Sequence, residues 1–307
     1  MKIILAAPRG CCAGVNMAVS SLDQALQMYG PPVFVYHEIV HNNWIVSQFE
    51  NKGVVFIDDL DEVPEGSYLM FSAHGVSPAI RERARTRGLL TIDATCPLVK
   101  KVHQEAVRFS QQGYTVFLIG HAGHDEVVGT LGVVPGIQLV ESEDDVASLR
   151  AEDPAKTAYV MQTTLSVDDA MKIVERLQLR FPSIVGPPTQ DICYATLNRQ
   201  HAVKDLLVRA DIVLVVGSQS SSNSSRLAEV ARSHGCPAYL IDGPREIAEN
   251  WFSGDETVLI TAGASAPEVL VQQCVRHLCQ RYNASIEEAT VREEHAQFPL
   301  PDFPLSV

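Results

Sequence analysis

The sequence predicts an α/β protein in which three small parallel-sheet units are related by a pseudo-threefold repeat around a central cavity. Three observations lead to this fold class. Short apolar strands alternate with helices from the first residues to about residue 281. The same order of strands and helices recurs three times along the chain. A cysteine lies in each of three turns that lead into a helix, at Cys12, Cys96 and Cys193.

The first predicted unit spans residues 13–96. Apolar residues at helical spacing indicate a helix over 12–29, which Gly30-Pro31-Pro32 ends. Short apolar segments rich in β-branched residues then predict four strands and two helices, with strands at 33–38, 54–58, 67–75 and 89–96 and helices at 44–50 and 77–88. Because strands alternate with helices, each unit should contain a parallel sheet.

The second predicted unit, residues 97–193, repeats this order. Its helices are expected at 98–112 and 167–181, and its strands at 114–126, 137–142 and 157–166, before the segment 183–193 that ends in Cys193. For the third unit, residues 194–281, the sequence predicts helices at 195–209, 224–235 and 268–280 and strands at 211–223, 237–242 and 256–267. It lacks a final strand and cysteine, so we expect residues 1–12 to complete it. Residues 282–307 lack the pattern and are expected to form a C-terminal tail packed on the outside.

The composition excludes several classes of protein. Of the 307 residues, 46% are hydrophobic and 20% are charged, which is ordinary for a globular chain. The net charge of −13 argues against general nucleic-acid binding. No apolar run of about 18 residues is present, so we expect no membrane span. The short apolar start lacks a signal-peptide pattern, so we expect a cytoplasmic protein.

The cysteine usage points away from a disulfide scaffold. Seven cysteines make an odd count, and no CxxC pair occurs, which argues against a zinc knuckle or a thioredoxin-type motif. Cys236, Cys274 and Cys279 lie in a turn or in amphipathic helix and are expected to be structural.

Polar residues gather at the predicted carboxyl ends of the strands, where parallel sheets bind ligands. They form three groups, each with one contribution from every unit: Cys12, Cys96 and Cys193; His41, His124 and Ser221–Asn223; His74, Thr163 and Ser265. Pseudo-threefold packing would turn all three groups towards one cavity. The alternative is three independent Rossmann-like layers whose loops face different directions.

Three converging cysteines without a fourth predict a metal site with an open position. Thiolates select zinc or iron–sulfur clusters, and a structural zinc ion would require a fourth ligand. A cubane cluster held by three cysteines leaves one iron available to a substrate, where it can act as a Lewis acid and pass electrons. The alternative is three unrelated buried thiols.

The second group has the character of an anion site. The segment SQSSSNSS, residues 218–225, runs directly into a helix, whose N-terminal amides and hydroxyls can surround a phosphate. His41, His74 and His124 add imidazoles that can carry charge near neutral pH. The alternative is a solvated helix start without a ligand.

Proton transfer is expected from a carboxylate near this site. Glu126 follows His124 by two residues and is suited to relay a proton, while Thr163 offers a hydroxyl as a relay or as a partner for a substrate alcohol. Asp125 and Asp191 are competing candidates, and their spacing alone does not rank them against Glu126.

Several of these motifs together resemble the 4-hydroxy-3-methylbut-2-enyl diphosphate reductases of the non-mevalonate isoprenoid pathway. The resemblance runs from residue 1 to about residue 280 and rests on the segments PRGCCAGV, HEIVHN, SAHGVS, DATCPLV, GHAGHDEVVGT, QTTLSVDD, DICYATLNRQ, SSSNSSRLAE and TAGASAP. It implies reductive dehydroxylation of an allylic diphosphate, in which a 4Fe–4S cluster binds the substrate hydroxyl and the products are isopentenyl and dimethylallyl diphosphates.

The resemblance also implies roles for single residues. Cys12, Cys96 and Cys193 would be the cluster ligands, Glu126 the proton donor, and Thr163 the partner of the substrate hydroxyl. The diphosphate-binding set would be His41, His74, His124, Ser221, Ser222, Asn223 and Ser265. The family usually has an apolar residue where this chain has Cys11, and we choose Cys12 as the ligand because AGV follows it.

The electron source should be a separate carrier such as ferredoxin or flavodoxin, because the chain has no dinucleotide-binding fingerprint. Two other functions remain possible on the same loops. One is a metal-dependent phosphoester hydrolase, which would turn over without a reductant. The other is a non-enzymatic binder of a phosphate ligand with structural thiols, in which Cys96→Ser would leave ligand affinity unchanged.

Overall fold

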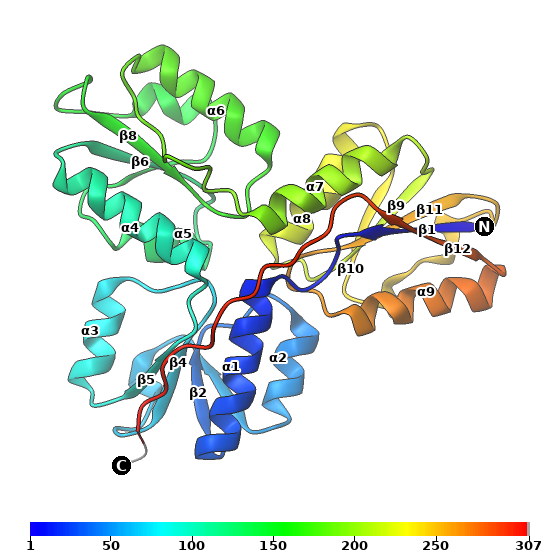
Figure 1. Cartoon of the computed structure of the whole chain (residues 1–307), viewed down its shortest axis with the longest axis horizontal. Helices are drawn as coiled ribbons and strands as arrows, with labels where there is room; N and C mark the ends of the chain where they lie inside the picture. The colour runs from blue at the N-terminus through cyan, green and yellow to red at the C-terminus, as the bar shows by residue number, and fades with distance from the viewer. Residues whose placement is uncertain (306–307) are drawn as a thin grey trace. The chain divides into compact units, whose positions relative to one another are not determined.

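The computed structural model describes residues 1–305 of the chain, and it divides into two compact units. One unit, which contains sheet A, comprises residues 1–16, 41–48 and 194–297. The other, which contains sheets B and C, comprises residues 17–40, 49–193 and the segment from residue 298. All three sheets are parallel, so the predicted α/β class with three small parallel sheets is confirmed (Figure 1). The described helices include none that combines the length and apolar character needed to cross a bilayer.

Sheet A has five strands in the order β10-β9-β11-β1-β12. The strands are β1 (Lys2–Ala7), β9 (Ile212–Val216), β10 (Ala238–Ile241), β11 (Thr257–Ala262) and β12 (Ser285–Thr290). The helices that lie wholly within this unit are α7 (Tyr194–Leu207), α8 (Ser222–Ser233) and α9 (Glu268–Tyr282).

Alternating side chains of sheet A build two cores on its opposite faces. Ile3 and Leu5 of β1 pack with α9, whereas Ile4 and Ala6 pack with α7 and α8. Strand β9 has the same alternation, and each of its five residues is buried. The near-continuous apolar sequence of these strands follows from burial on both faces, as expected for a parallel sheet covered by helices (Figure 1).

Strand β1 lies inside sheet A, although it is the first element of the chain. Its residues pair with β11 on one side, where Lys2 lies opposite Thr257, and with β12 on the other, where Lys2 lies opposite Ser285. The terminal ammonium group of Met1 donates to the carbonyl of Gly254 at 2.7 Å. The third predicted unit lacked a final strand after its predicted strand 256–267, and the N-terminal strand β1 takes this place in sheet A.

Deletion of residues 1–10 should unfold sheet A rather than trim a terminus. The side chains of Ile3, Ile4 and Leu5 are at most 5% exposed, and burial of each contributes about 1.5–3 kcal/mol, a large part of a domain's usual stability. Limited proteolysis should then cleave within residues 194–297. Lys2→Ala is the matched control, since its exposed ion pair with Glu287 contributes little. Intact sheet A in the deletion variant would contradict this prediction.

Sheet B has four strands in the order β3-β2-β4-β5. The strands are β2 (Val33–Tyr36), β3 (Val54–Ile57), β4 (Tyr68–Phe71) and β5 (Leu90–Asp93). The helices in this part of the sequence are α1 (Ala13–Tyr29), α2 (Asn43–Glu50) and α3 (Pro78–Thr86), and most of α2 belongs to the unit of sheet A. One face of the sheet packs Phe34, Leu69 and Phe71 against Ala84 of α3. The helix and strand positions agree with those expected from the sequence to within a few residues.

Sheet C has three strands in the order β7-β6-β8. The strands are β6 (Thr115–Ile119), β7 (Gln138–Val140) and β8 (Thr157–Met161), and the helices are α4 (Pro97–Gln111), α5 (Asp125–Leu131) and α6 (Val167–Arg180). Short 3₁₀ helices occur at Leu60–Glu62, Asp144–Ser148, Pro244–Glu246 and Glu249–Trp251.

Three elements differ from the sequence expectations. Strand β6 ends at Ile119, and the second half of the expected strand 114–126 is a turn followed by helix α5. Strand β9 ends at Val216, and the second half of the expected strand 211–223 is a turn followed by helix α8, which begins at Ser222. Residues 285–290 of the expected tail form strand β12. The predicted boundaries of the three units stay a prediction.

Candidate functional site

The three candidate ligands occupy the same kind of turn. Cys12 directly precedes α1, Cys96 caps α4, and Cys193 directly precedes α7. Each cysteine donates its backbone N–H at 3.0 Å to the carbonyl of the second residue beyond a strand, and the acceptors are Ala264 after β11, Ala73 after β4 and Thr163 after β8. The local geometry of the three turns is therefore equivalent.

This donor set fits a cluster with thiolate ligands. All seven cysteines are thiols in the structure, and Cys12, Cys96 and Cys193 are each half-buried. A thiol at the start of a helix lies at the positive end of the helix dipole, which favours the thiolate form that binds metal. Thiolates are soft ligands, which suit iron–sulfur clusters or zinc.

Cys11 differs from its neighbour in its backbone contacts. The backbone hydrogen bond shared by the three equivalent turns belongs to Cys12, so register supports Cys12 as the ligand. Burial, followed by the adjacent Cys12, raises the pKa of the Cys11 thiol to about 12.

The ends of β4, β8 and β11 also define a register for the third polar group. The third residues beyond these strands are His74, Thr164 and Ser265. Thr163, which the sequence grouped with His74 and Ser265, instead matches Ala73 and Ala264, one position earlier. The predicted group of His74, Thr163 and Ser265 therefore mixes residues from two positions, the second and the third residue beyond a strand.

Glu126 and Thr163 form a closed pair at the carboxyl edge of sheet C. Glu126 is the second residue of α5 and is 2% exposed. Its Oε1 accepts from the backbone N–H of Thr163 at 2.7 Å, and its Oε2 accepts from the Thr163 hydroxyl at 2.8 Å. The carboxyl group is thus fixed in one orientation and hydrogen-bonded to a hydroxyl that can carry a proton onward.

Asn223 occupies the equivalent position in sheet A. It is the second residue of α8, and its Oδ1 accepts from the backbone N–H of Ala264 at 2.8 Å, as Glu126 accepts from Thr163. Its Nδ2 donates to the hydroxyl of Thr196 at 3.1 Å. The amide of Asn223 can bind a ligand but has no acidic proton, so the proton donor is expected at the equivalent residue of α5, Glu126.

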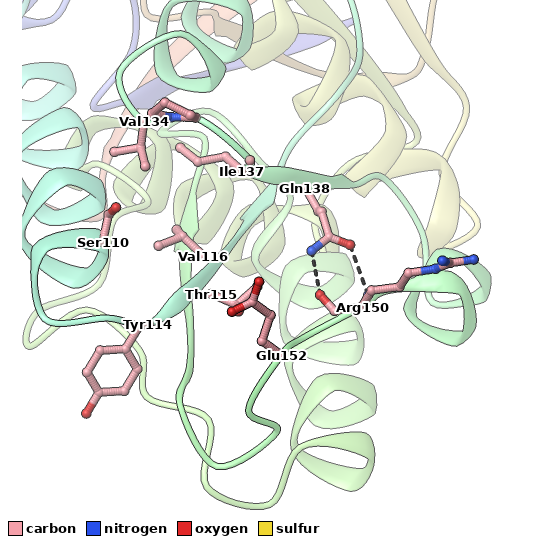
Figure 2. A pocket seen from close by; sticks show the side chains of 11 residues that line it. Ser110, Tyr114, Thr115, Val116, Val134, Ile137, Gln138, Arg150 and Glu152 are labelled. Carbon is pink, nitrogen blue, oxygen red and sulfur yellow. Dashed lines mark hydrogen bonds between the residues drawn. The ribbon is translucent and has the colours of Figure 1, made fainter.

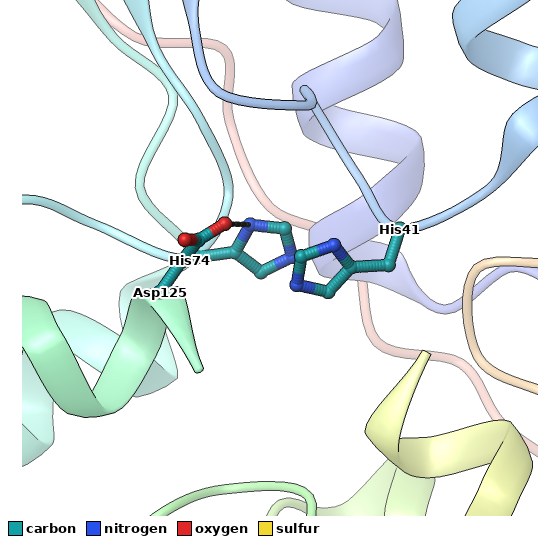
Figure 3. Close-up of side chains that lie close together, drawn as sticks. All are labelled: His41, His74 and Asp125. Carbon is teal, nitrogen blue, oxygen red and sulfur yellow. Dashed lines mark ion pairs between the residues drawn. The ribbon is translucent and has the colours of Figure 1, made fainter. Parts of the chain in front are cut away.

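His74 and Asp125 lie together within the unit of sheets B and C. His74 Nδ1 is 3.6 Å from Asp125 Oδ2 (Figure 3). The rings of His74 and His124 meet edge to face, with centroids 5.9 Å apart. The backbone N–H of Glu126 donates to His124 Nδ1 at 3.2 Å, which leaves Nε2 of a neutral ring as the proton-bearing nitrogen. Nε2 can therefore donate to an anion.

The serine-rich segment forms the start of α8, with Ser221 as its N-cap and Ser222 as its first residue. Ser221 Oγ accepts from the backbone N–H of Ser224 at 3.3 Å. Ser265 donates its hydroxyl to the carbonyl of His41 at 2.8 Å and lies 3.4 Å from the Ser221 hydroxyl. These hydroxyls meet at a helix N-terminus, where anions are stabilised.

Asp191 lies two residues before Cys193. It bonds the edge of β8 that a fourth strand of sheet C would cover, as the fourth strand does in sheet B. Its Oδ2 accepts from the backbone N–H of Met161 at 2.9 Å, a group that a neighbouring strand would otherwise bond. Its Oδ1 lies 3.3 Å from Lys101 Nζ. Burial raises the pKa of this carboxyl group to about 6. These contacts favour a supporting role over that of a competing acid.

Asp93 ends strand β5, three residues before Cys96, and its Oδ1 accepts from the backbone N–H of Thr95 at 3.1 Å. Burial opposes ionisation, but hydrogen bonds from Thr95 and ion pairs with Arg81 (3.1 Å) and Lys100 (2.9 Å) lower the pKa of Asp93 to about 2. This residue is not predictable from the sequence, because an aspartate at the end of a strand carries no distinct signal.

Asp93→Asn should lower the free energy of unfolding by about 2 kcal/mol at neutral pH. The pKa in the folded state lies below the ordinary value of 3.8, so this stabilisation is complete above about pH 4 and is lost as the pH falls towards 2. Urea unfolding of both proteins across this range measures the difference. Asp58→Asn, whose side chain is 90% exposed, is the control. A difference that persists unchanged to pH 3 would contradict the assignment.

A separate cavity of about 310 Å³ lies at the opposite edge of sheet C (Figure 2). Thr115 and Gln138, the first residues of β6 and β7, line it together with Arg150, whose backbone exchanges two hydrogen bonds with the Gln138 side chain. The cavity lies at the amino ends of β6 and β7, whereas Glu126 and Thr163 follow the carboxyl ends of β6 and β8, so this cavity is separate from the candidate site residues of sheet C.

Comparison with known proteins gives a consistent result over nearly the whole chain. Residues 3–279 match the family model described as LytB protein. A 4-hydroxy-3-methylbut-2-enyl diphosphate reductase of Rhodopirellula baltica is 59% identical, with 98% of this chain and 95% of that protein covered.

Solved structures agree with this relationship. The E-1-hydroxy-2-methyl-but-2-enyl-4-diphosphate reductase of Plasmodium falciparum superposes with a TM-score of 0.94 at 38% identity, covering 98% of this chain and 95% of that one. A second structure, of an (E)-4-hydroxy-3-methyl-but-2-enyl diphosphate reductase, has a TM-score of 0.64 at 32% identity, covering 91% of this chain and 100% of that one.

Proposed function

Because the chain belongs to the LytB family, we propose that it is an enzyme that reduces 4-hydroxy-3-methylbut-2-enyl diphosphate to isopentenyl and dimethylallyl diphosphates. In this reaction the allylic carbon–oxygen bond breaks and the hydroxyl leaves as water. Two electrons and two protons are consumed, one proton by the leaving hydroxyl and one by the carbon skeleton. The closed pair of Glu126 and Thr163 is the structural observation that carries the proposal.

The iron–sulfur group of this family would be held by Cys12, Cys96 and Cys193. The equivalent turns of these residues support this assignment, as do their positions at helix starts. We infer a 4Fe–4S cluster, since three thiolates leave one of four irons without a protein ligand. When bound, the cluster would supply electrons and a Lewis-acidic iron for the substrate hydroxyl.

The diphosphate would be bound by hydroxyls, an amide and imidazoles. Supporting observations are the N-terminus of α8 with its cap Ser221 and the contact of Ser265 with Ser221. The proposed set is His41, His74, His124, Ser221, Ser222, Asn223 and Ser265. Holding the diphosphate at several points orients the distant alcohol, so that binding energy contributes to catalysis.

Glu126 would provide the proton that converts the departing hydroxyl into water. Thr163 holds both the carboxyl group and, in this proposal, the substrate hydroxyl, so the proton has a short path. The pair is buried, which keeps bulk water away from the proton that is transferred.

The electrons would come from a separate protein such as ferredoxin or flavodoxin, since the sequence has no dinucleotide-binding fingerprint. A diphosphate substrate and protein electron carriers are both water-soluble, so we propose that the enzyme is cytoplasmic. A reconstituted assay with each carrier in turn would identify the donor.

Anaerobic purification followed by iron, sulfide and zinc analysis tests the proposal. We expect brown protein with about four irons and four sulfides per chain if the cluster is 4Fe–4S, and turnover that requires a reductant. Colourless protein with stoichiometric zinc, or hydrolysis of the diphosphate without a reductant, would instead support a phosphoester hydrolase. Mössbauer spectra with and without substrate distinguish binding at the cluster from binding elsewhere.

A further inference from the structure

Arg199 is the largest fully buried side chain of the protein's described residues, and it is charged. It lies in α7, and its Nε and Nη2 both donate to the carbonyl of Gly10, at 3.2 and 2.6 Å. Its Nη1 donates to the carbonyl of Ala195 at 2.8 Å. A guanidinium taken out of water requires such partners, because an unpaired buried charge is strongly destabilising.

The counter-charge comes from the C-terminal segment. The carboxylate of Glu294 lies 3.1 and 3.3 Å from Arg199 Nη1 and also accepts from Asn198 Nδ2 at 3.0 Å. The Glu294 side chain is 15% exposed, whereas that of its neighbour Glu293 is 75% exposed and pairs only with His295 at the surface. Glu294 is thus built into the interior, in a part of the chain that the sequence analysis assigned to an outer tail.

The Gly10 carbonyl belongs to the loop that carries Cys12. Gly10 has a φ of +69°, and a Cβ there would lie 3.0 Å from the carbonyl of Ala266, so the loop passes close to the backbone that follows β11. The backbone N–H of Gly10 donates to Ala262, and that of Cys12 donates to Ala264. Arg199 therefore holds the carbonyl of Gly10, which lies between these two anchors.

We propose that Arg199 and Glu294 are positioning residues for the Cys12 turn, and that the C-terminal segment thereby forms part of the iron–sulfur site. This inference rests on the proposed function in that Cys12 is taken as a cluster ligand. The other two turns have supports close in sequence, Asp93 before Cys96 and Asp191 before Cys193. The Cys12 turn has a support from a segment more than 280 residues away.

Amide hydrogen exchange of the full-length protein tests the proposal, with and without the bound cluster. In Glu294→Gln the charge of Arg199 loses its partner, and we expect exchange in residues 9–13 to rise by about tenfold or more. Residues 94–97 around Cys96 should remain unchanged. Glu293→Gln is the matched control, and Glu294→Asp, which keeps the charge, should restore most of the protection.

A second readout is the rate at which the anaerobic holoprotein loses iron to a chelator. We expect Glu294→Gln to lose iron about tenfold faster than the wild type and Glu293→Gln to match the wild type. Exchange that rises equally around Cys96 and in β9 would show a purely structural role and overturn the proposal. Unchanged exchange in residues 9–13 would overturn it as well. If Glu294→Gln does not fold, Asn198→Ala replaces it. This variant removes the hydrogen bond from Asn198 Nδ2 to Glu294 and should give a smaller rise in exchange that is confined to residues 9–13.

These outcomes are separable from failure of the proposed function. Wild-type protein without iron or sulfide would refute the cluster, whereas exchange in the metal-free chain would still report whether Arg199 fixes the loop. A brown wild-type protein with unchanged exchange in Glu294→Gln would refute only the positioning role.

Discussion

Glu126→Gln is expected to lower the turnover number by about 10²-fold or more while the cluster and substrate affinity remain. The amide oxygen can still accept from the Thr163 backbone N–H, and the amide nitrogen can donate to the Thr163 hydroxyl, so the local geometry is preserved. What is lost is the acidic proton. Steady-state rates with an artificial reductant, together with iron content and substrate binding, measure these effects separately.

Asp125→Asn is the matched control for Glu126→Gln. The two acids are neighbours at the start of α5, but Asp125 pairs with His74, whereas Glu126 pairs with Thr163. We expect the Asp125 variant to change KM more than turnover, because His74 belongs to the proposed diphosphate set. Near-normal turnover in Glu126→Gln, with a large loss in Asp125→Asn, would reassign the proton donor.

Cys12→Ala is expected to abolish cluster binding, whereas Cys11→Ala should retain it. Only Cys12 shares the backbone hydrogen bond seen at Cys96 and Cys193, and only its position directly precedes a helix as theirs do. Removal of one of three thiolates leaves a cluster with two protein ligands, which should be lost during purification. Iron and sulfide content and the visible absorption of anaerobic protein measure the outcome.

The paired design of the cysteine variants makes the result decisive. Both substitutions remove one thiol from the same loop, so differences in colour cannot be attributed to general disturbance of residues 8–14. Cys274→Ala, deep in the core that packs on α9, is a further control that should keep the cluster. Retention of iron in Cys12→Ala together with its loss in Cys11→Ala would show that the register is shifted by one residue.

The sequence predicted most of the fold because burial on both faces gives each parallel strand a short, apolar, unambiguous run. It also predicted that the N-terminus completes the last sheet, since a strand was missing from an otherwise regular order. It did not predict β12, whose sequence SIEEAT is acidic and mostly exposed, and which pairs along only one edge. Helix α5 was missed because its seven residues follow a glycine-rich turn.

The site was predictable to the extent that it follows the repeat. The three cysteine turns and the helix start at Ser221 emerge from position alone, while the one-residue difference between Thr163 and His74 requires the observed ends of β8 and β4. Arg199 could not be found, because a charged residue within a helix ordinarily faces solvent and its partner Glu294 lies 95 residues away. Asp191 was noticed as an acid, but its bond to Met161 depends on the absent fourth strand.

The place of β1 in sheet A also sets the order in which the protein can fold during its synthesis. All four strands of sheet B lie between residues 33 and 93 and can associate as soon as that part has left the ribosome. Strand β1 is translated first, yet its partners β11 and β12 end at residues 262 and 290. At about 5–20 residues per second, β1 remains without its neighbours for many seconds. The turn that carries Cys12 can therefore acquire its final form only when translation is almost finished.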